Sequence, residues 1–320
     1  MRRARCGDPR TKRPLRARWK ARVYVTLGQS GITAMSQTLR LVTYNLQRGI
    51  HYGRIRHHLA TLSRLREADV IAVQEALVPV GGTNTLARLA ADLDGEYGWT
   101  YRTVMSYPDK EYGNGFLFRP TVTPELGLNV PLPRVERLGW VARLKTEGGV
   151  PDTKSAYVQV FNTGGRRLRL VSLHLDFAGG ADHRVRQLSH LLQVLEQRAL
   201  SDAAAADVLC GDFNTSGYYW SAIAQKATRR VLDVARVHGF ADWSSSVPWT
   251  SDMFASVDPA DPACRLLQVG QAVGLRYRQK LDHVLGRGVR PVGPTIRVGA
   301  TGRDHLPGSD HVPLAVELVL

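Results

Sequence analysis

Two short segments, far apart in the chain, place acidic, amide and imidazole side chains at the ends of apolar runs. Residues 208–214 read Val-Leu-Cys-Gly-Asp-Phe-Asn, and residues 309–314 read Ser-Asp-His-Val-Pro-Leu before a final apolar run. Short, wholly apolar runs of this kind are typical of buried strands. Polar groups at the edge of a core are costly unless they find partners. The chain must therefore fold so that these strand ends meet polar groups, and a metal ion with a phosphate ester would satisfy them.

The rest of the chain alternates strand and helix patterns from residue 38 onward. Residues 182–200 carry apolar side chains at helical spacing, and residues 54–67 and 84–94 do so more weakly. Because the two kinds of element mix without a break in composition, we expect a single α/β domain over residues 36–320, with two sheets packed face to face and helices outside. The strands are expected at 39–44, 70–73, 99–104, 114–119, 155–161, 168–174, 207–211, 280–286, 294–298 and 312–319.

The N-terminal segment differs from the remainder in charge. Residues 1–34 hold ten Lys or Arg and one acid, which is +9 of the net +15, so a polyanionic partner is compatible with the charge but not required by it. We expect a disordered basic arm there, and we find no secretory signal and no transmembrane segment. Three widely spaced cysteines fit neither a disulfide framework nor a zinc site, which favours the cytoplasm.

Polar side chains recur at the ends of the other strands as well. If the strand ends converge, oxygen ligands and two imidazoles meet on a rigid scaffold in one pocket. Carboxylates and carboxamides without thiolates suit a hard divalent ion, Mg²⁺ or alternatively Mn²⁺. The residues concerned are Asn45, Glu75, His174, Asp212, Asn214, Asp282, Asp310 and His311.

The order of these residues resembles the endonuclease/exonuclease/phosphatase superfamily, which includes deoxyribonucleases and neutral sphingomyelinases. The match extends in order from Leu39 to Leu318, and the Gly-Asp-Phe-Asn and Ser-Asp-His segments are its most specific parts. The resemblance implies an α/β (α+β) four-layer sandwich of two mostly antiparallel sheets flanked by helices. It also implies a metal-dependent hydrolase of phosphoric esters.

The resemblance implies a role for each residue. Glu75 would be the main metal ligand, with Asn45 and Asp310 as direct or water-mediated partners. His311 would be the general base and Asp282 would orient it, while Asp212 would align the attacking water or help bind metal. Asn214 and His174 would bind the phosphate, with His174 on the leaving-group side. Asn114, in a Gly-Asn-x-x-Leu-like segment, would contact phosphate or support His174.

Simpler interpretations remain for some of these residues. Asn45 could cap a turn, and Glu75 could pair with a surface arginine, for which Arg48 and Arg54 are available. The substrate is equally open. We expect a phosphodiester in nucleic acid or a phospholipid head group, and infer no stable protein partner.

Three alternatives compete with a general phosphodiesterase: a true nuclease on DNA or RNA, a phosphoinositide phosphatase, and a non-catalytic polyanion-binding protein. Arg276, Arg278 and Lys280 form a small basic cluster that would suit phosphoinositides. Ala76 and Leu77 follow Glu75, where apurinic endonucleases usually carry a lysine, and this counts against a role in DNA repair. The third alternative is disfavoured because every expected catalytic residue type is present.

Overall fold

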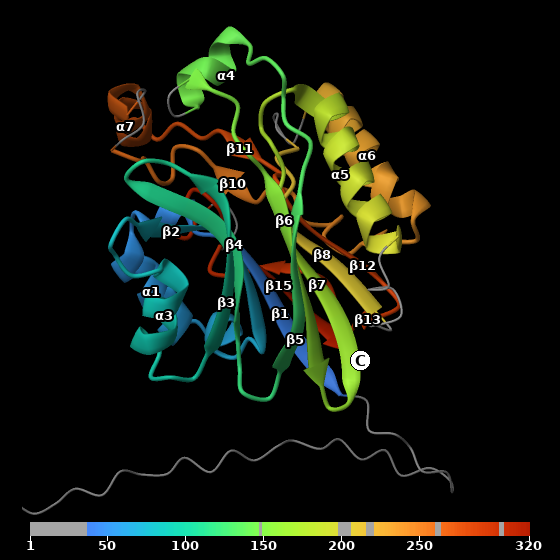
Figure 1. Cartoon of the computed structure of the whole chain (residues 1–320). Coiled ribbons are helices and arrows are strands. Elements are labelled where there is room, and N and C mark those ends of the chain that lie inside the picture. The colour runs from blue at the N-terminus through green and yellow to red at the C-terminus, as the bar shows by residue number, and fades with distance from the viewer. Residues whose placement is uncertain (1–36, 147–148, 198–205, 216–220, 260–263, 301–303) are drawn as a thin grey trace, which may run out of the picture. The chain divides into compact units, whose positions relative to one another are not determined.

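Two mixed β-sheets pack face to face at the centre of the fold, and helices cover their outer faces (Figure 1). The computed structural model describes residues 37–320 apart from 147–148, 198–205, 216–220, 260–263 and 301–303. The predicted arm at 1–34 therefore lies outside the described residues. Ser36–Leu320 form one compact unit.

The first sheet contains one parallel pair, β1–β2, among antiparallel neighbours, so the expectation of mostly antiparallel sheets holds for it. Its strand order is β13 (Arg290–Pro291), β15 (Leu314–Val319), β1 (Thr38–Asn45), β2 (Val70–Pro79), β4 (Lys110–Phe118) and β3 (Gly98–Ser106), with β14 (Ile296–Arg297) also paired to β15.

The second sheet follows the same plan, with β7–β8 as its parallel pair. Its strand order is β5 (Thr123–Pro131), β6 (Ser155–Thr163), β7 (Arg166–His174), β8 (Ala206–Asp212), β12 (Asp282–Arg287) and β9 (Ala241–Asp242). A small separate sheet joins β10 (Ser251–Asp252) to β11 (Arg278–Gln279).

Alternation along the central strands explains the layers. Leu39 and Leu41 of β1 enter the core between the two sheets, whereas Val42 and Tyr44 enter the core beneath the helices of the first sheet. Successive side chains of a strand point to opposite faces, so a strand apolar on both faces must be covered on both. The first sheet is covered by α1 (Tyr52–Thr61), α2 (Ser63–Arg66) and α3 (Thr85–Asp92).

The second sheet is covered by α5 (Gly180–Gln197) and α6 (Ala222–Val237), as Figure 1 shows. Leu188, Leu191, Leu192 and Leu195 of α5 pack on Val171, Leu173 and Leu209 in a third core. Cys210 lies between the sheets, and burial raises the pKa of its thiol to about 12, so it is an inert core residue. Within the described residues, every helix is too short or too polar to traverse a bilayer.

Some elements differ from the sequence-based expectation. The helix predicted at 54–67 is broken into α1 and α2 at Leu62, which has an extended backbone with ψ of 118°. Residues 244–275, for which the sequence patterns predicted neither a strand nor a helix, contain β10 and α7 (Cys264–Ala272). The strand β5 and the helix α4 (Trp140–Lys145) were not predicted, because their patterns are weakly apolar: β5 is largely exposed at the sheet edge.

Candidate active site

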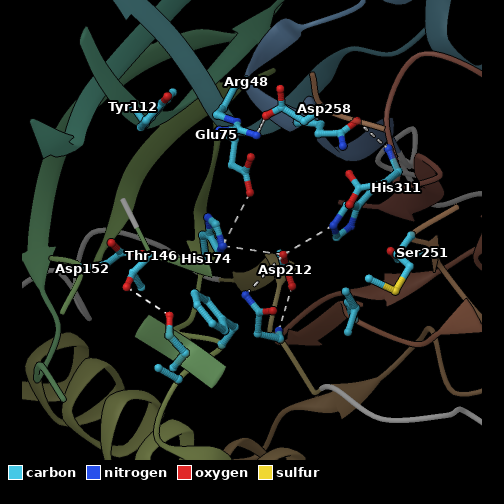
Figure 2. Close-up of a pocket in the computed structure, with 18 of the residues that line it drawn as sticks. Arg48, Glu75, Tyr112, Thr146, Asp152, His174, Asp212, Ser251, Asp258 and His311 are labelled. Atoms are coloured by element: carbon cyan, nitrogen blue, oxygen red, sulfur yellow. Dashed lines mark hydrogen bonds and ion pairs between the residues drawn. The ribbon is translucent and has the colours of Figure 1, made fainter. Parts of the chain in front are cut away.

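The predicted site residues come together because the strands that carry them end at the same place. In the parallel pair β7–β8, His174 is the register partner of Asp212, and in the antiparallel pair β8–β12, Asp212 is the partner of Asp282. Asn45, the last residue of β1, is the register partner of Gln74, which precedes Glu75 in the middle of β2. Figure 2 shows Glu75, His174, Asp212 and His311 directed toward one another in one pocket.

A β-bulge directs Glu75 into this pocket. The register between β2 and β4 shifts between Val73 and Ala76, and Glu75 adopts a left-handed backbone with φ of 55°. Bulges commonly redirect a side chain near an active site. Although burial opposes ionisation, His174, Arg48 and His311 together lower the pKa of Glu75, which is therefore an ionised carboxylate in the pocket.

Asn45 joins the two carboxylates. Its Nδ2 donates to Glu75 Oε1 at 3.1 Å and to Asp212 Oδ2 at 3.2 Å, while its Oδ1 accepts from the backbone N–H of Gln47 at 3.0 Å. The side chain therefore caps a turn and contacts the site at the same time. The atom that faces the carboxylates is the amide nitrogen, which donates hydrogen bonds to them.

Asp212 lies at the centre of the cluster. Its Oδ1 accepts from the backbone N–H of Asn214 at 2.8 Å, and the Asn214 side chain donates to the carbonyl of Leu175 at 2.8 Å. Both side chains line the pocket. Burial raises the pKa of Asp212 to about 7, although His311 opposes that shift.

His311 and Asp282 form a tightly bonded pair. Nδ1 of His311 lies 2.7 Å from Asp282 Oδ2, and its Nε2 lies 3.7 Å from Asp212 Oδ2 on the pocket side. Burial alone would lower the pKa of His311, but the carboxylates of Asp282, Asp310 and Asp212 outweigh it and raise that pKa well above its usual value. Ser309 fixes the segment, because its hydroxyl donates to the carbonyl of Asn45 and accepts from the His311 N–H.

His174 faces the same carboxylates from the other sheet. Its Nε2 lies 3.8 Å from Glu75 Oε1 and 3.7 Å from Asp212 Oδ2. Burial, and then the charge of Lys154, lower its pKa to about 3. The imidazole is therefore neutral at physiological pH, and it can either donate a hydrogen bond or present a lone pair.

Ligand atoms of Glu75, His174 and Asp212 lie within 4.8 Å of one another, a group able to hold a metal ion. The donor set of two carboxylates and one imidazole suits a divalent ion bound mainly through oxygen. Burial also raises the pKa of Asp310 to about 6, although His311 opposes that shift. Burial thus favours the neutral forms of both carboxyl groups, and a bound divalent ion would favour their ionised forms.

Two predicted residues need separate comment. Asp310 lines the pocket, and its N–H bonds to the Gln47 side chain at 3.1 Å, but it lies outside the Glu75–His174–Asp212 group. Asn114 is buried between the sheets and is not among the residues that line the pocket. Its Nδ2 donates to the carbonyls of Ser155 and Ser172, the latter two residues before His174. Asn114 is therefore placed to support the strand that carries His174, and it does not reach the surface of the pocket.

The pocket has a volume of about 910 Å³ and includes residues that the sequence patterns did not single out as functional. Arg48 follows the Asn45 turn with a left-handed φ of 59° and forms an ion pair with Asp258. Its charge helps to lower the pKa of Glu75 from inside the pocket, while its ion-pair partner is Asp258. Lys154, almost fully buried, lies beside Asp152 and also lines the pocket. Nothing in the local sequence marks these residues as functional, because a short 3₁₀ helix and a loop bring them to the pocket.

The basic cluster considered for phosphoinositides is engaged with protein groups. Arg276 and Arg278 lie 3.7 and 3.5 Å from Asp252, and Lys280 donates to the carbonyl of Ser244 at 2.7 Å. Arg278 also stacks on Trp249. All three basic side chains therefore bind other protein groups close to the pocket.

Comparison with known proteins places this geometry in context. The family model described as "Endonuclease/Exonuclease/phosphatase family" matches residues 42–311. A search among curated proteins found no match.

Solved structures with a similar fold include TDP2 from D. rerio complexed with single-strand DNA product, at 16% identity, TM-score 0.59, and coverage of 88% of this chain and 99% of that one. The human Nocturnin catalytic domain with bound sulfate is 15% identical, with TM-score 0.56 and coverage of 88% and 94%. A Bacteroides thetaiotaomicron mannosyl-6-phosphatase is 15% identical, with TM-score 0.56 and coverage of 88% and 100%.

Proposed function

The chain belongs to the Endonuclease/Exonuclease/phosphatase family, and on that premise we propose that it is a divalent-metal-dependent hydrolase of a phosphodiester. The single observation that carries this proposal is the convergence of Glu75, His174, Asp212 and the His311–Asp282 pair on one pocket. A purely polyanion-binding protein has no need for a buried, carboxylate-oriented imidazole whose free nitrogen faces that pocket.

The residues present fit a divalent ion, with Mg²⁺ first and Mn²⁺ as the alternative. Glu75 would be the principal ligand, Asp212 and His174 lie within reach of the same position, and Asp310 would act directly or through water. Asn45, which the sequence placed among the metal partners, presents its amide nitrogen to the carboxylates and would instead hold Glu75 and Asp212 in place. When bound, such an ion polarises a phosphoryl oxygen and stabilises the departing oxyanion. Its charge would also offset the carboxylates that hold the proton on His311, which favours the neutral imidazole needed in a base.

The chain's own residues supply the remaining steps. His311 Nε2 accepts a proton from the attacking water, and the Asp282 carboxylate keeps the Nδ1–H directed away from the pocket. Asp212, 3.7 Å from that Nε2, is placed to align the water. Asn214 and the neutral His174 donate hydrogen bonds to the phosphate, with His174 on the leaving-group side.

Hydrolysis of bis(p-nitrophenyl) phosphate tests this proposal. We expect activity that stops with EDTA and returns with Mg²⁺. Replacing His311 by Gln should lower kcat by about 10²–10⁴-fold, because positioned acid–base groups typically supply that much. Asp282→Asn should also lower kcat, with KM and thermal stability little changed, since Asp282 acts through His311.

The matched control is His57→Gln, which alters an exposed histidine of α1 and should keep the wild-type rate. Full activity in EDTA, or a wild-type rate for His311→Gln, would refute the assignment. We further propose a cytoplasmic location, based on the sparse cysteines, and no obligatory protein partner.

A further inference from the structure

The mouth of the pocket is bordered by two helices that the hydrolytic chemistry does not use. Trp140, Ala142 and Thr146 of α4 and its C-terminal end line the pocket on one side, and Leu267 of α7 lines it on another. Figure 1 shows α4 and α7 at the same end of the sandwich, beyond the ends of the central strands. Anything that approaches the pocket from this end therefore passes these two helices.

An apolar stripe on α7 and on the residue that follows it is exposed, although a surface helix usually turns its apolar stripe to the core; Arg265, Gln268 and Gln271 are exposed beside it. Leu266, Val269 and Val273 follow one another at spacings of three and four and are 74%, 60% and 69% exposed. The inward side is also occupied: a side chain at Gly270 would meet the Phe254 ring at 2.4 Å. Across the mouth, Trp140 is 77% exposed. We call Leu266, Val269, Val273 and Trp140 the apolar rim.

The charge beside the apolar rim is predominantly positive. Residues 264–276 contain no Asp or Glu, and Glu136 is the acid within 134–146. Among the described side chains of these two stretches, the exposed basic ones are Arg134, Arg137, Arg143, Arg265 and Arg276, the last of which also lies 3.7 Å from Asp252. An apolar surface surrounded by arginines is complementary to an anionic lipid surface, which offers acyl chains beneath negative head groups.

We propose that the apolar rim docks on an anionic membrane surface, so that the pocket mouth faces phosphate-bearing lipid head groups. This inference rests on the proposed function for the nature of the substrate, but not for the docking itself. Leu266, Val269 and Val273 enter the headgroup–acyl boundary, Trp140 takes the interfacial position that indole favours, and the arginines remain at head-group level. No membrane-crossing segment is needed for binding of this kind.

Two other ligands could cover the apolar rim: single-stranded nucleic acid and a second copy of this chain. The chemistry of the rim disfavours both. Single-stranded nucleic acid is held by several aromatic side chains on which successive bases stack, whereas Leu266, Val269 and Val273 are aliphatic and Trp140 is the one aromatic side chain of the rim. A second copy of the chain would bring the same arginines against one another, at an electrostatic cost. Both remain outcomes of the test.

The test measures binding of the full chain to phosphatidylcholine vesicles with and without phosphatidylserine, by co-sedimentation. We expect binding that requires phosphatidylserine and weakens with salt, because exposed charges are screened. The triple variant Leu266→Ser, Val269→Ser, Val273→Ser should lower the vesicle partition coefficient by at least about tenfold, since it removes most of the inserted apolar area. These three residues lie off the pocket, so hydrolysis of soluble bis(p-nitrophenyl) phosphate should stay at the wild-type rate.

A matched triple variant, Ile223→Ser, Val237→Ser, Val292→Ser, removes exposed apolar side chains elsewhere and should bind vesicles like the wild type. Both variants keep the basic segment 1–34, so its contribution to binding cancels in the comparison.

Equal vesicle binding by the α7 variant and the wild type would overturn the proposal. So would an α7 variant that loses only binding to single-stranded DNA, or one that changes from dimer to monomer in light scattering. Vesicle binding is measured without turnover, so it tests membrane docking even if the protein proves not to be a hydrolase. If the α7 variant loses vesicle binding but hydrolyses the soluble substrate normally, the apolar rim acts in docking and not in catalysis.

Discussion

At the residue scale, one glycine allows β8 to lie close to its neighbour β7 and to Gln74 of the other sheet, beside the site. Gly211 precedes Asp212 and has a φ of 132°, a backbone conformation that residues with a side chain rarely adopt. A Cβ there would meet the Leu173 carbonyl oxygen at 2.1 Å and the Gln74 side-chain nitrogen at 3.0 Å. The glycine of the Gly-Asp-Phe-Asn segment is therefore required for packing as well as for backbone conformation.

Replacing Gly211 by Ala should lower the free energy of unfolding by about 2 kcal/mol or more, because it adds backbone strain and a steric clash. Urea denaturation monitored by circular dichroism measures the change. Gly53→Ala is the control: a Cβ added to Gly53 of α1 would meet no atom of the described residues within 4 Å, and alanine there should stabilise by up to about 1 kcal/mol. Similar stability changes for the two variants would show that the close approach at Gly211 is unimportant.

At the scale of elements, a buried ion network ties together the three strands that carry the second sheet's site residues. Arg169 of β7, which is 1% exposed, donates from Nε and Nη2 to both oxygens of Asp207 of β8 at 2.6 and 2.8 Å. Arg287 of β12 donates to the same carboxylate at 2.7 Å. The network fixes the register of β7, β8 and β12, whose other ends present His174, Asp212 and Asp282.

Asp207→Ala should destabilise the protein by about 3–5 kcal/mol, because it leaves the Arg169 charge buried without its partner. Thermal and urea unfolding provide the measurement. Asp233→Ala removes the partner of Arg236 in an exposed pair on α6 and should cost no more than about 1 kcal/mol. If Asp207→Ala unfolds at the same urea concentration as Asp233→Ala, the network does not hold the strands in register.

At the scale of the whole molecule, the pocket is shared between the two sheets. The first sheet provides Glu75 from β2 and His311 from the segment just before β15. The second sheet provides His174, Asp212 and Asp282. Neither half holds the cluster alone. The buried carboxylates therefore repel one another across the interface between the sheets, and a cation that binds them links the sheets.

Mg²⁺ or Mn²⁺ should for this reason raise the melting temperature of the wild-type protein. A ligand present at a hundred times its dissociation constant stabilises the folded state by about 2.7 kcal/mol, which corresponds to several degrees in a domain of this size. Differential scanning fluorimetry measures the shift, with NaCl of equal ionic strength as the control. Glu75→Gln should abolish the response, and an unchanged response in that variant would place the ion elsewhere.

Much of the site could be predicted because its residues follow strands whose apolar patterns are strong. Asp212 closes the recognisable strand β8, and His311 lies just before β15. Their positions in the sequence therefore indicated that both lie at strand ends. Arg48 and Lys154 could not be predicted as pocket residues, since Arg48 lies in the short 3₁₀ helix η1 (Gln47–Gly49) and Lys154 in a loop, and the course of both depends on packing. The break at Leu62 was also missed, because the helical periodicity continues across it.

By itself, the order of residues determined which strands are buried on both faces and which polar side chains stand at their ends, because side-chain alternation and the cost of burying unpaired polar groups are local properties. Only the tertiary structure decided that Asn45 would present its amide nitrogen to the carboxylates, that Asn114 would lie between the sheets, and that an aliphatic helix face would border the pocket. Those outcomes depend on contacts between segments that lie far apart in the sequence. Such contacts are set by how whole layers pack.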